Sequence, residues 1–248
     1  MNLEVFEELL KETASQYDFE MINHGLDNIE IHKLEKPICF LRHDIDFSPQ
    51  NALRMAQLEQ EYGANSTYTV LLSGQYYNPF EKNIREVLKK IKSYGHEVGL
   101  HFDPTVYNIC EEFSLNDYIE KEASALADLL EGPISMFSFH NTTDFSMSCR
   151  AFEYGGLVNA YSNFFHNEVE YTSDSNGYWR FRSWKDLLLE KHKVIQILTH
   201  PIWWQPENNY PPFETVIKNI TERADLCLSI YTELFRGQNL RINHSLLN

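Results

Sequence analysis

Short apolar runs alternate along this chain with segments that repeat apolar residues at helical spacing. Five runs bounded by turn residues predict strands, and they cover 38–41, 67–72, 98–100, 134–139 and 194–198. Between them, apolar residues recur at helical intervals, as at Ile84, Val87, Leu88 and Ile91, which predicts helices with one buried face. Strands that alternate with helices favour a parallel sheet or barrel, so the predicted fold class is α/β.

The length of 248 residues suits one α/β domain with a sizeable core. Within it we expect a helical extension at 1–36, a part that carries the motifs at 37–205, and a C-terminal helix in 206–248. Residues 141–193 are rich in Asn, Ser, Tyr and Phe and contain glycine breakers, so loops and short strands are expected there.

The charge balance limits the kinds of partner. There are 21 Lys and Arg against 36 Asp and Glu, a net charge of −15, which opposes binding to nucleic acid or to an anionic membrane surface. No segment has the apolar length of a membrane span. The first residues lack the basic start and apolar core of a signal peptide, so we expect a cytoplasmic protein that binds a small neutral or cationic ligand.

Polar residues with metal-binding side chains follow the predicted strands. Asp44 and Asp46 are two residues apart, so on an extended backbone both carboxylates face the same way, unless the pair only caps the following helix. His101, His140 and His200 each end another strand. The carboxyl ends of parallel strands meet at one edge, where α/β proteins build their sites. Carboxylates and imidazoles together predict a site for a divalent metal.

Aromatic residues lie beside these motifs. Trp203 and Trp204 directly follow His200 and Pro201, and Trp179 lies in another polar segment. Their rings suit either the apolar face of a sugar or packing at the rim of a site. His96 follows a glycine at a turn and is expected to be a structural histidine.

Together these motifs resemble the polysaccharide deacetylase family with the NodB homology fold. Asp44-Ile-Asp46 is similar to the family's paired aspartates, and the segment from Gly95 to His101 is similar to its second motif. The segment 173–179 takes the place of the fourth motif, and Leu198-Thr-His200 is similar to the closing one. The resemblance spans residues 37 to about 205 and implies an irregular (β/α) barrel.

The resemblance also implies an activity, the metal-dependent removal of an acetyl group from an amino sugar, sugar nucleotide or glycan intermediate. Asp46 and His101 would bind a divalent ion, with zinc the first choice. Asp44 would be the general base, and His200 would protonate the departing amine. A related hydrolase of another carbon–nitrogen bond and a catalytically inactive carbohydrate-binding protein are the alternatives.

The chain departs from the family pattern at two places that matter for the site. Four residues after His101, where the family has a second metal-binding histidine, stands Thr105. Asp103 or His140 can complete the ligand set, and we favour His140 because its strand end should lie at the same height as that of His101.

The second departure concerns the base and the substrate. The family's two aspartates are adjacent, whereas here Ile45 separates them, and the family's arginine motif is missing. Arg42, Arg180 or Arg182 can take over the orientation of the base. Residues beside the motifs are expected to contact a carbohydrate substrate, namely Arg42, Asp103, Asp174, Trp179, Arg182, Trp203 and Trp204.

Overall fold

The computed structural model describes residues 1–248 except 24–25, 27–29, 207–209 and 238–248. The chain divides into two compact units, Met1–Asn209 and Tyr210–Asn248, and each is described by itself. The second unit contains the helix α8 (Pro212–Gly237), which lies within the segment 206–248 where a C-terminal helix was predicted. The last eleven residues of that predicted segment, 238–248, lie outside the described residues. None of the described helices is apolar and long enough to cross a membrane.

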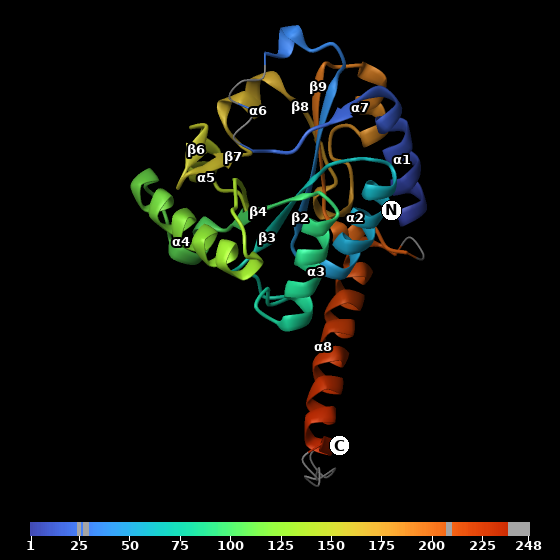
Figure 1. The fold of residues 1–248 in the computed structure, drawn as a ribbon, viewed down its shortest axis with the longest axis vertical. Coiled ribbons are helices and arrows are strands. Elements are labelled where there is room, and N and C mark those ends of the chain that lie inside the picture. The colour runs from blue at the N-terminus through green and yellow to red at the C-terminus, as the bar shows by residue number, and fades with distance from the viewer. Residues whose placement is uncertain (24–25, 27–29, 207–209, 238–248) are drawn as a thin grey trace. The chain divides into compact units, whose positions relative to one another are not determined.

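The first unit is built on a sheet of nine strands, drawn in Figure 1. The strand order is β6-β7-β5-β4-β3-β2-β9-β8, and β1 pairs with β2 beside this path. Among the strands of the described residues, the β6–β7 pair alone is antiparallel. The strands are β1 (Asp18–Phe19), β2 (Ile38–Ile45), β3 (Thr67–Leu71), β4 (Glu97–Phe102), β5 (Met136–Phe139), β6 (Glu153–Tyr154), β7 (Leu157–Asn159), β8 (Glu170–Ser173) and β9 (Val194–Thr199).

This sheet confirms the predicted α/β class and the irregular barrel. The five predicted strands are β2, β3, β4, β5 and β9, and they form the parallel centre of the sheet. In the described part of the chain the outer strands β6 and β8 do not pair with each other, so the curled sheet stays open. The four strands that periodicity did not locate have two to four residues, too few for an alternating pattern to show.

The helices that cover the sheet form a row in which each helix contacts the next. Contacts connect α7 to α1, α1 to α2, α2 to α3 and α3 to α4. Their bounds, with those of the short α5 and α6, are α1 (Leu3–Gln16), α2 (Pro49–Glu61), α3 (Lys82–Ser93), α4 (Glu112–Leu130), α5 (Asp144–Ser148), α6 (Asn163–Glu168) and α7 (Trp184–Glu190). The helices α5, α6 and α7 lie where loops and short strands were expected, and each is too short to show a helical repeat.

The N-terminal segment is part of the core rather than an appendage. Phe6 and Leu10 of α1 are fully buried in one apolar cluster with Trp184 and Trp204. The ring of Phe6 contacts the edges of both indoles, with centroid distances of 5.7 and 5.3 Å. The predicted extension therefore packs against the segments that follow β8 and β9.

Every residue of β2 is buried, and its side chains point alternately to the two faces of the sheet. Cys39 and Leu41 pack in the cluster with α1, α2 and α7, whereas Phe40 packs in a separate cluster on the opposite face. Because side chains alternate along a strand, Arg42 and Asp44 share the inner face with Phe40. The inner face is thus apolar at the start of β2 and charged at its carboxyl end.

The end of α7 provides a test of local backbone strain. Lys191 follows the helix in the left-handed conformation, with φ of 58°. This conformation costs a non-glycine residue about 1–2 kcal/mol, part of which glycine's greater freedom in the unfolded chain offsets. We expect Lys191→Gly to raise the free energy of unfolding by about 0.5–1 kcal/mol in urea denaturation. The control Lys185→Gly, inside the helix, should lower it by up to about 1 kcal/mol.

Candidate metal centre

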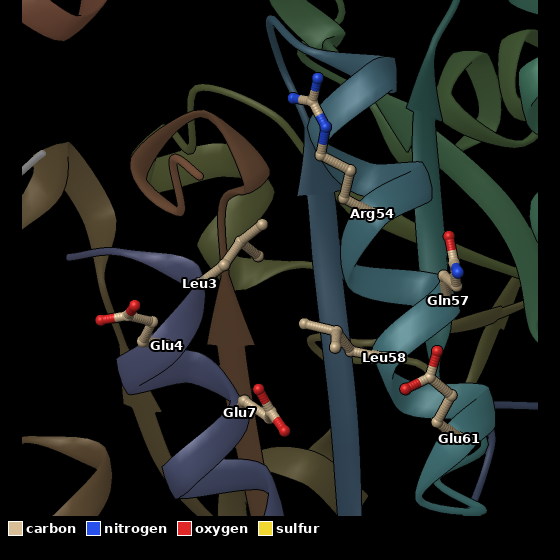
Figure 2. Close-up of a pocket in the computed structure, with 7 residues that line it drawn as sticks. All are labelled: Leu3, Glu4, Glu7, Arg54, Gln57, Leu58 and Glu61. Carbon is tan, nitrogen blue, oxygen red and sulfur yellow. The ribbon is translucent and has the colours of Figure 1, made fainter. Parts of the chain in front are cut away.

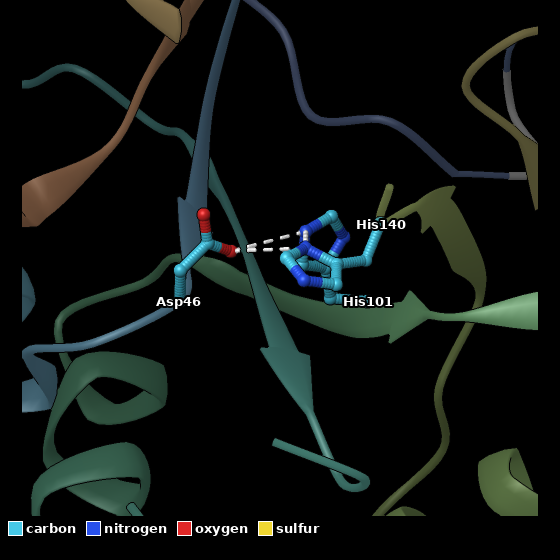
Figure 3. Close-up of side chains that lie close together, drawn as sticks. All are labelled: Asp46, His101 and His140. Carbon is cyan, nitrogen blue, oxygen red and sulfur yellow. Dashed lines mark hydrogen bonds and ion pairs between the residues drawn. The ribbon is translucent and has the colours of Figure 1, made fainter. Parts of the chain in front are cut away.

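Three ligand atoms converge at the carboxyl ends of β2, β4 and β5. Asp46 follows β2, His101 lies in β4 and His140 directly follows β5. Asp46 Oδ1 lies 3.2 Å from His101 Nε2 and 3.5 Å from His140 Nδ1, as Figure 3 shows. The two imidazole nitrogens are 3.2 Å apart. The sheet has therefore brought together, from three strands, a group that can hold a metal ion.

The triangle of ligand atoms has the size that a tetrahedral metal requires. Nitrogen and oxygen ligands bind zinc at about 2.0–2.1 Å, which places neighbouring ligand atoms about 3.3 Å apart. The three observed distances are 3.2, 3.2 and 3.5 Å. Asp46 Oδ1 is also buried and has no hydrogen-bond partner of good geometry among the described residues. A cation between the three atoms would satisfy it, so these residues fit a divalent ion.

Hydrogen bonds determine which nitrogen of His101 faces the cluster. Thr69 Oγ1 donates to Asp44 Oδ1 at 2.7 Å, and Ser138 Oγ donates to the same oxygen at 3.3 Å. Because the Ser138 hydroxyl donates to Asp44 and to Thr69 Oγ1 at 3.2 Å, its oxygen is left to accept from His101 Nδ1, 2.8 Å away. With the proton on Nδ1, His101 presents the lone pair of Nε2 to Asp46 and His140, the form in which an imidazole binds a metal.

Asp44 is held by a buried arginine from its own strand. Arg42 Nε lies 3.1 Å from Asp44 Oδ1 and Arg42 Nη2 donates to Oδ2 at 3.2 Å, with both side chains almost fully buried. Burial raises the pKa of Asp44, but Arg42 together with His101, His200 and Thr69 outweighs burial and holds the pKa below its usual value. Asp44 is therefore ionised at neutral pH, as a general base must be.

The Arg42 pair yields a stability prediction. Removing one partner of a buried ion pair typically costs about 3–5 kcal/mol, because the remaining charge stays buried. We expect Arg42→Gln to lower the free energy of unfolding at pH 7 by that amount in urea denaturation. Asp44→Asn in the same chain should restore part of it. A double variant less stable than Arg42→Gln would show that Asp44 does not depend on this arginine.

His200 is oriented by a fully buried carboxylate, Asp174. Asp174 Oδ1 accepts from His200 Nδ1 at 2.7 Å and from the His200 backbone N–H at 2.9 Å, and Oδ2 accepts from Trp204 Nε1 at 2.8 Å. Burial lowers the pKa of His200, but the hydrogen bond and charge of Asp174, with Asp46 and Asp44, raise it overall to about 9. His200 Nε2 lies 3.9 Å from Asp46 Oδ2, so a protonated imidazole faces the cluster.

Asp103 is engaged in holding a loop and does not join the three ligand atoms. Its Oδ1 accepts from the backbone N–H and hydroxyl of Thr105, at 2.9 and 2.6 Å. Its Oδ2 accepts from Asn141 Nδ2 at 3.1 Å, next to His140. Asp103 is 6% exposed and already carries three hydrogen bonds. Of the two proposed third ligands, the geometry therefore favours His140. Asp103 instead holds Asn141, the residue that follows His140.

Three of the expected substrate contacts are buried and engaged by other residues. Arg42 is 1% exposed and pairs with Asp44. Asp174 is 0% exposed and binds His200, and Trp204 is 0% exposed in the apolar core. Contact of these three residues with a substrate stays a prediction.

Three further substrate predictions remain open to a ligand. Trp179 and Trp203 are half-buried at the edge of the apolar cluster that contains Trp204. Arg182 forms surface ion pairs with Glu170 and Glu190, and Arg180 is exposed. Contact of Trp179, Trp203 or Arg182 with substrate stays a prediction.

Two hydroxyl residues of the site were missed by the sequence reasoning. Ser138 lies two residues before His140 and Thr69 lies in β3, and both face inward with Asp44. The alternation of Phe137, Ser138 and Phe139 would have placed Ser138 on the inner face. Nothing in the sequence pairs either hydroxyl with Asp44, because those contacts depend on neighbouring strands.

A shallow pocket elsewhere in the first unit contains none of the predicted site residues. It lies between α1 and α2 (Figure 2). The residues that line it are Leu3, Glu4, Glu7, Arg54, Gln57, Leu58 and Glu61. Glu7 already accepts from the hydroxyl of Tyr62 at 2.6 Å and pairs with Lys11, so the pocket brings no unsatisfied reactive group together.

No protein-family model matches the chain, and no curated protein matches it either. Similar solved structures include a Streptococcus pyogenes deacetylase in complex with acetate, at 12% identity over 89% of this chain and 87% of that one, with a TM-score of 0.45. A chitin deacetylase from the fungal pathogen Colletotrichum lindemuthianum has 12% identity over 76% and 84%, with a TM-score of 0.41. A CE4 family pseudoenzyme from Bacillus anthracis has 12% identity over 77% and 62%, with a TM-score of 0.41.

Two of these three structures are of deacetylases and one is of a pseudoenzyme. Fold alone does not establish an activity, and the chemistry of this chain has to be argued from its own residues.

Proposed function

We propose that this protein is a metal-dependent deacetylase that removes an acetyl group from an N-acetylated amino sugar, free or within a sugar nucleotide or glycan. The observation that carries the proposal is the joint placement of three groups. The Asp46, His101 and His140 cluster can hold a metal, Asp44 lies beside it with its pKa held below the usual value, and His200 faces it with its pKa raised to about 9.

The chain's own residues supply a base and an acid to the same place. Asp44 Oδ2 lies 3.9 Å from His101 Nε2, and His200 Nε2 lies 3.9 Å from Asp46 Oδ2. Asp44, kept ionised by Arg42, would take a proton from the attacking water. His200, kept protonated by Asp174, would give a proton to the departing amine. Hydrolysis of an amide needs both transfers, because a neutral amine leaves and a free carboxylate forms.

Asp46, His101 and His140 would hold the metal. A bound divalent ion, for which zinc is the proposed identity, lowers the pKa of water and polarises a carbonyl. The net charge of −15 favours a neutral substrate, such as a free amino sugar or a neutral glycan, over the anionic sugar nucleotide. Trp179 and Trp203 are the proposed aromatic contacts for the sugar. A cytoplasmic location remains part of this proposal.

Acetate release tests the reaction. The protein is loaded with zinc, cobalt or nickel and supplied with N-acetylglucosamine, its nucleotide-linked form and short chitin oligomers. We expect acetate and free amine to appear in equal amounts, and Asp44→Asn, which keeps the ligand triangle, to stop both. Amine release from a formyl-amino sugar or opening of a cyclic amide, with no acetate from the N-acetylated substrates, would indicate hydrolysis of another carbon–nitrogen bond. Carbohydrate binding by the metal-loaded wild type without amine release would indicate an inactive relative.

A further inference from the structure

A second polar cluster lies beneath the metal site, on the helix face of the sheet. Its centre is Glu59 of α2, which is fully buried. Glu59 Oε1 lies 2.6 Å from His43 Nε2, and Oε2 accepts from Ser66 Oγ at 2.6 Å and from the Tyr68 hydroxyl at 2.7 Å. The other nitrogen of His43, Nδ1, lies 2.6 Å from Thr199 Oγ1. One carboxylate of α2 thus reaches β2, β3 and β9.

The ionisation of Glu59 is consistent with this arrangement. Burial raises the pKa of Glu59, but His43, His96 and Ser66 outweigh it, so the net pKa lies below its ordinary value. His96 completes the cluster through Ser66 Oγ at 2.9 Å and the Ala56 carbonyl at 2.9 Å, in agreement with its expected structural role. A buried carboxylate with this many partners holds all of them in one geometry.

The cluster occupies the row of the sheet directly before the reacting groups. His43 is paired in register with Thr199 on β9 and with Tyr68 on β3. The next residue after His43 is Asp44, and the next after Thr199 is His200. A strand turns successive side chains to opposite faces. His43 and Thr199 therefore face the helices, while Asp44 and His200 face the site. Hydrogen bonds on the helix face of the sheet therefore hold the backbone of β2 and β9 next to Asp44, the proposed base, and His200, the proposed acid.

We infer that the relay of Glu59, His43 and Thr199 is a positioning device, which couples α2 to β2 and β9 and sets the relative placement of Asp44 and His200. None of the three touches the metal cluster, and they act through the two residues that follow them in the chain. The inference rests on the proposed function for its effect on rate. The effect of the relay on the order of the β2–β9 junction does not depend on the proposed function.

The test compares two single-hydroxyl deletions in the metal-loaded protein. Thr199→Val removes the bond between His43 and β9, and Ser66→Ala removes a bond to the same Glu59 outside the β2–β9 junction. Thr199→Ser keeps the hydroxyl and serves as the conservative rescue. Native-state hydrogen exchange measures the opening of backbone N–H groups at residues 43–46 and 199–200, and acetate release gives kcat and KM.

We expect Thr199→Val to speed exchange at residues 43–46 by at least about tenfold, with Ser66→Ala and Thr199→Ser within about twofold of wild type there. Thr199→Val should also lower kcat by about tenfold with KM little changed, because small displacements of reacting groups slow the reaction strongly. Equal exchange at this junction in Thr199→Val and Ser66→Ala would overturn the inference, as would a normal kcat with a loosened junction.

The failure of the proposed function is distinguishable from these outcomes. A wild type that releases no acetate from any substrate refutes the deacetylase proposal. The exchange data then still decide whether the relay orders the junction.

Discussion

Replacing any one of Asp46, His101 and His140 by alanine is expected to remove the metal. Wild-type protein dialysed against zinc should contain about one ion per chain, and each variant should bind zinc more than about a hundredfold more weakly. The reason is that the three ligand atoms form one triangle with sides of 3.2–3.5 Å, so losing one leaves only two protein ligands. Metal analysis and calorimetric titration measure this result.

Thermal stability gives a second readout that needs no substrate. A ligand that binds only the folded protein stabilises it by about 2.7 kcal/mol at a hundred times its dissociation constant. Zinc should therefore raise the Tm of the wild type and leave the Tm of the three variants nearly unchanged.

Asp103→Asn is the matched control, because Asp103 Oδ1 and Oδ2 already accept from Thr105 and Asn141. It should keep about one zinc per chain. Loss of metal in Asp103→Asn combined with retention in His140→Ala would show that the third ligand is Asp103.

The second large effect is expected from Asp174→Asn. Its neutral amide removes the largest of the contributions that raise the pKa of His200 to about 9, while those of Asp46 and Asp44 remain. Since burial by itself lowers the pKa of a histidine, the imidazole should lose its proton near neutral pH and cease to act as an acid. We expect kcat/KM at pH 8 to fall about a hundredfold, and the alkaline limb of its pH profile to move from about pH 9 to a lower pH.

The same substitution should change how stability depends on pH. A histidine whose folded pKa is raised adds stability that is complete below its unfolded pKa of about 6.5 and is lost as the pH rises through the folded value. Wild-type stability should therefore decline between pH 6.5 and about 9, whereas Asp174→Asn should show a flatter profile in urea denaturation.

Trp204→Phe removes one donor to Asp174 without touching His200 and serves as the control. Its alkaline limb should stay near that of the wild type, although the protein should be less stable. An unshifted limb in Asp174→Asn would assign the alkaline ionisation to another group and remove His200 as the acid.

The sequence alone determined the repeating architecture and most candidates for the site. Hydrophobic periodicity is a local property, so β2, β3, β4, β5 and β9 and the long helices could be predicted. The polar residues that end those strands could be named as a group, because parallel strands end at the same edge of a sheet. The candidate site residues Asp44, Asp46, His101 and His200 were named in this way.

The tertiary structure decided which candidates act on each other. His140 rather than Asp103 completes the triangle because β5 pairs with β4, which brings His140 beside His101. Arg42 rather than Arg180 or Arg182 pairs with Asp44, the proposed base, because it lies two residues before Asp44 on the inner face of the same strand.

Asp174 and Glu59 show the same limit of sequence reasoning. Asp174 meets His200 only through the pairing of β8 with β9, and Glu59 meets Thr199 only through His43. These choices depend on strand order, register and burial, which arise when distant segments pack together and which no local pattern encodes.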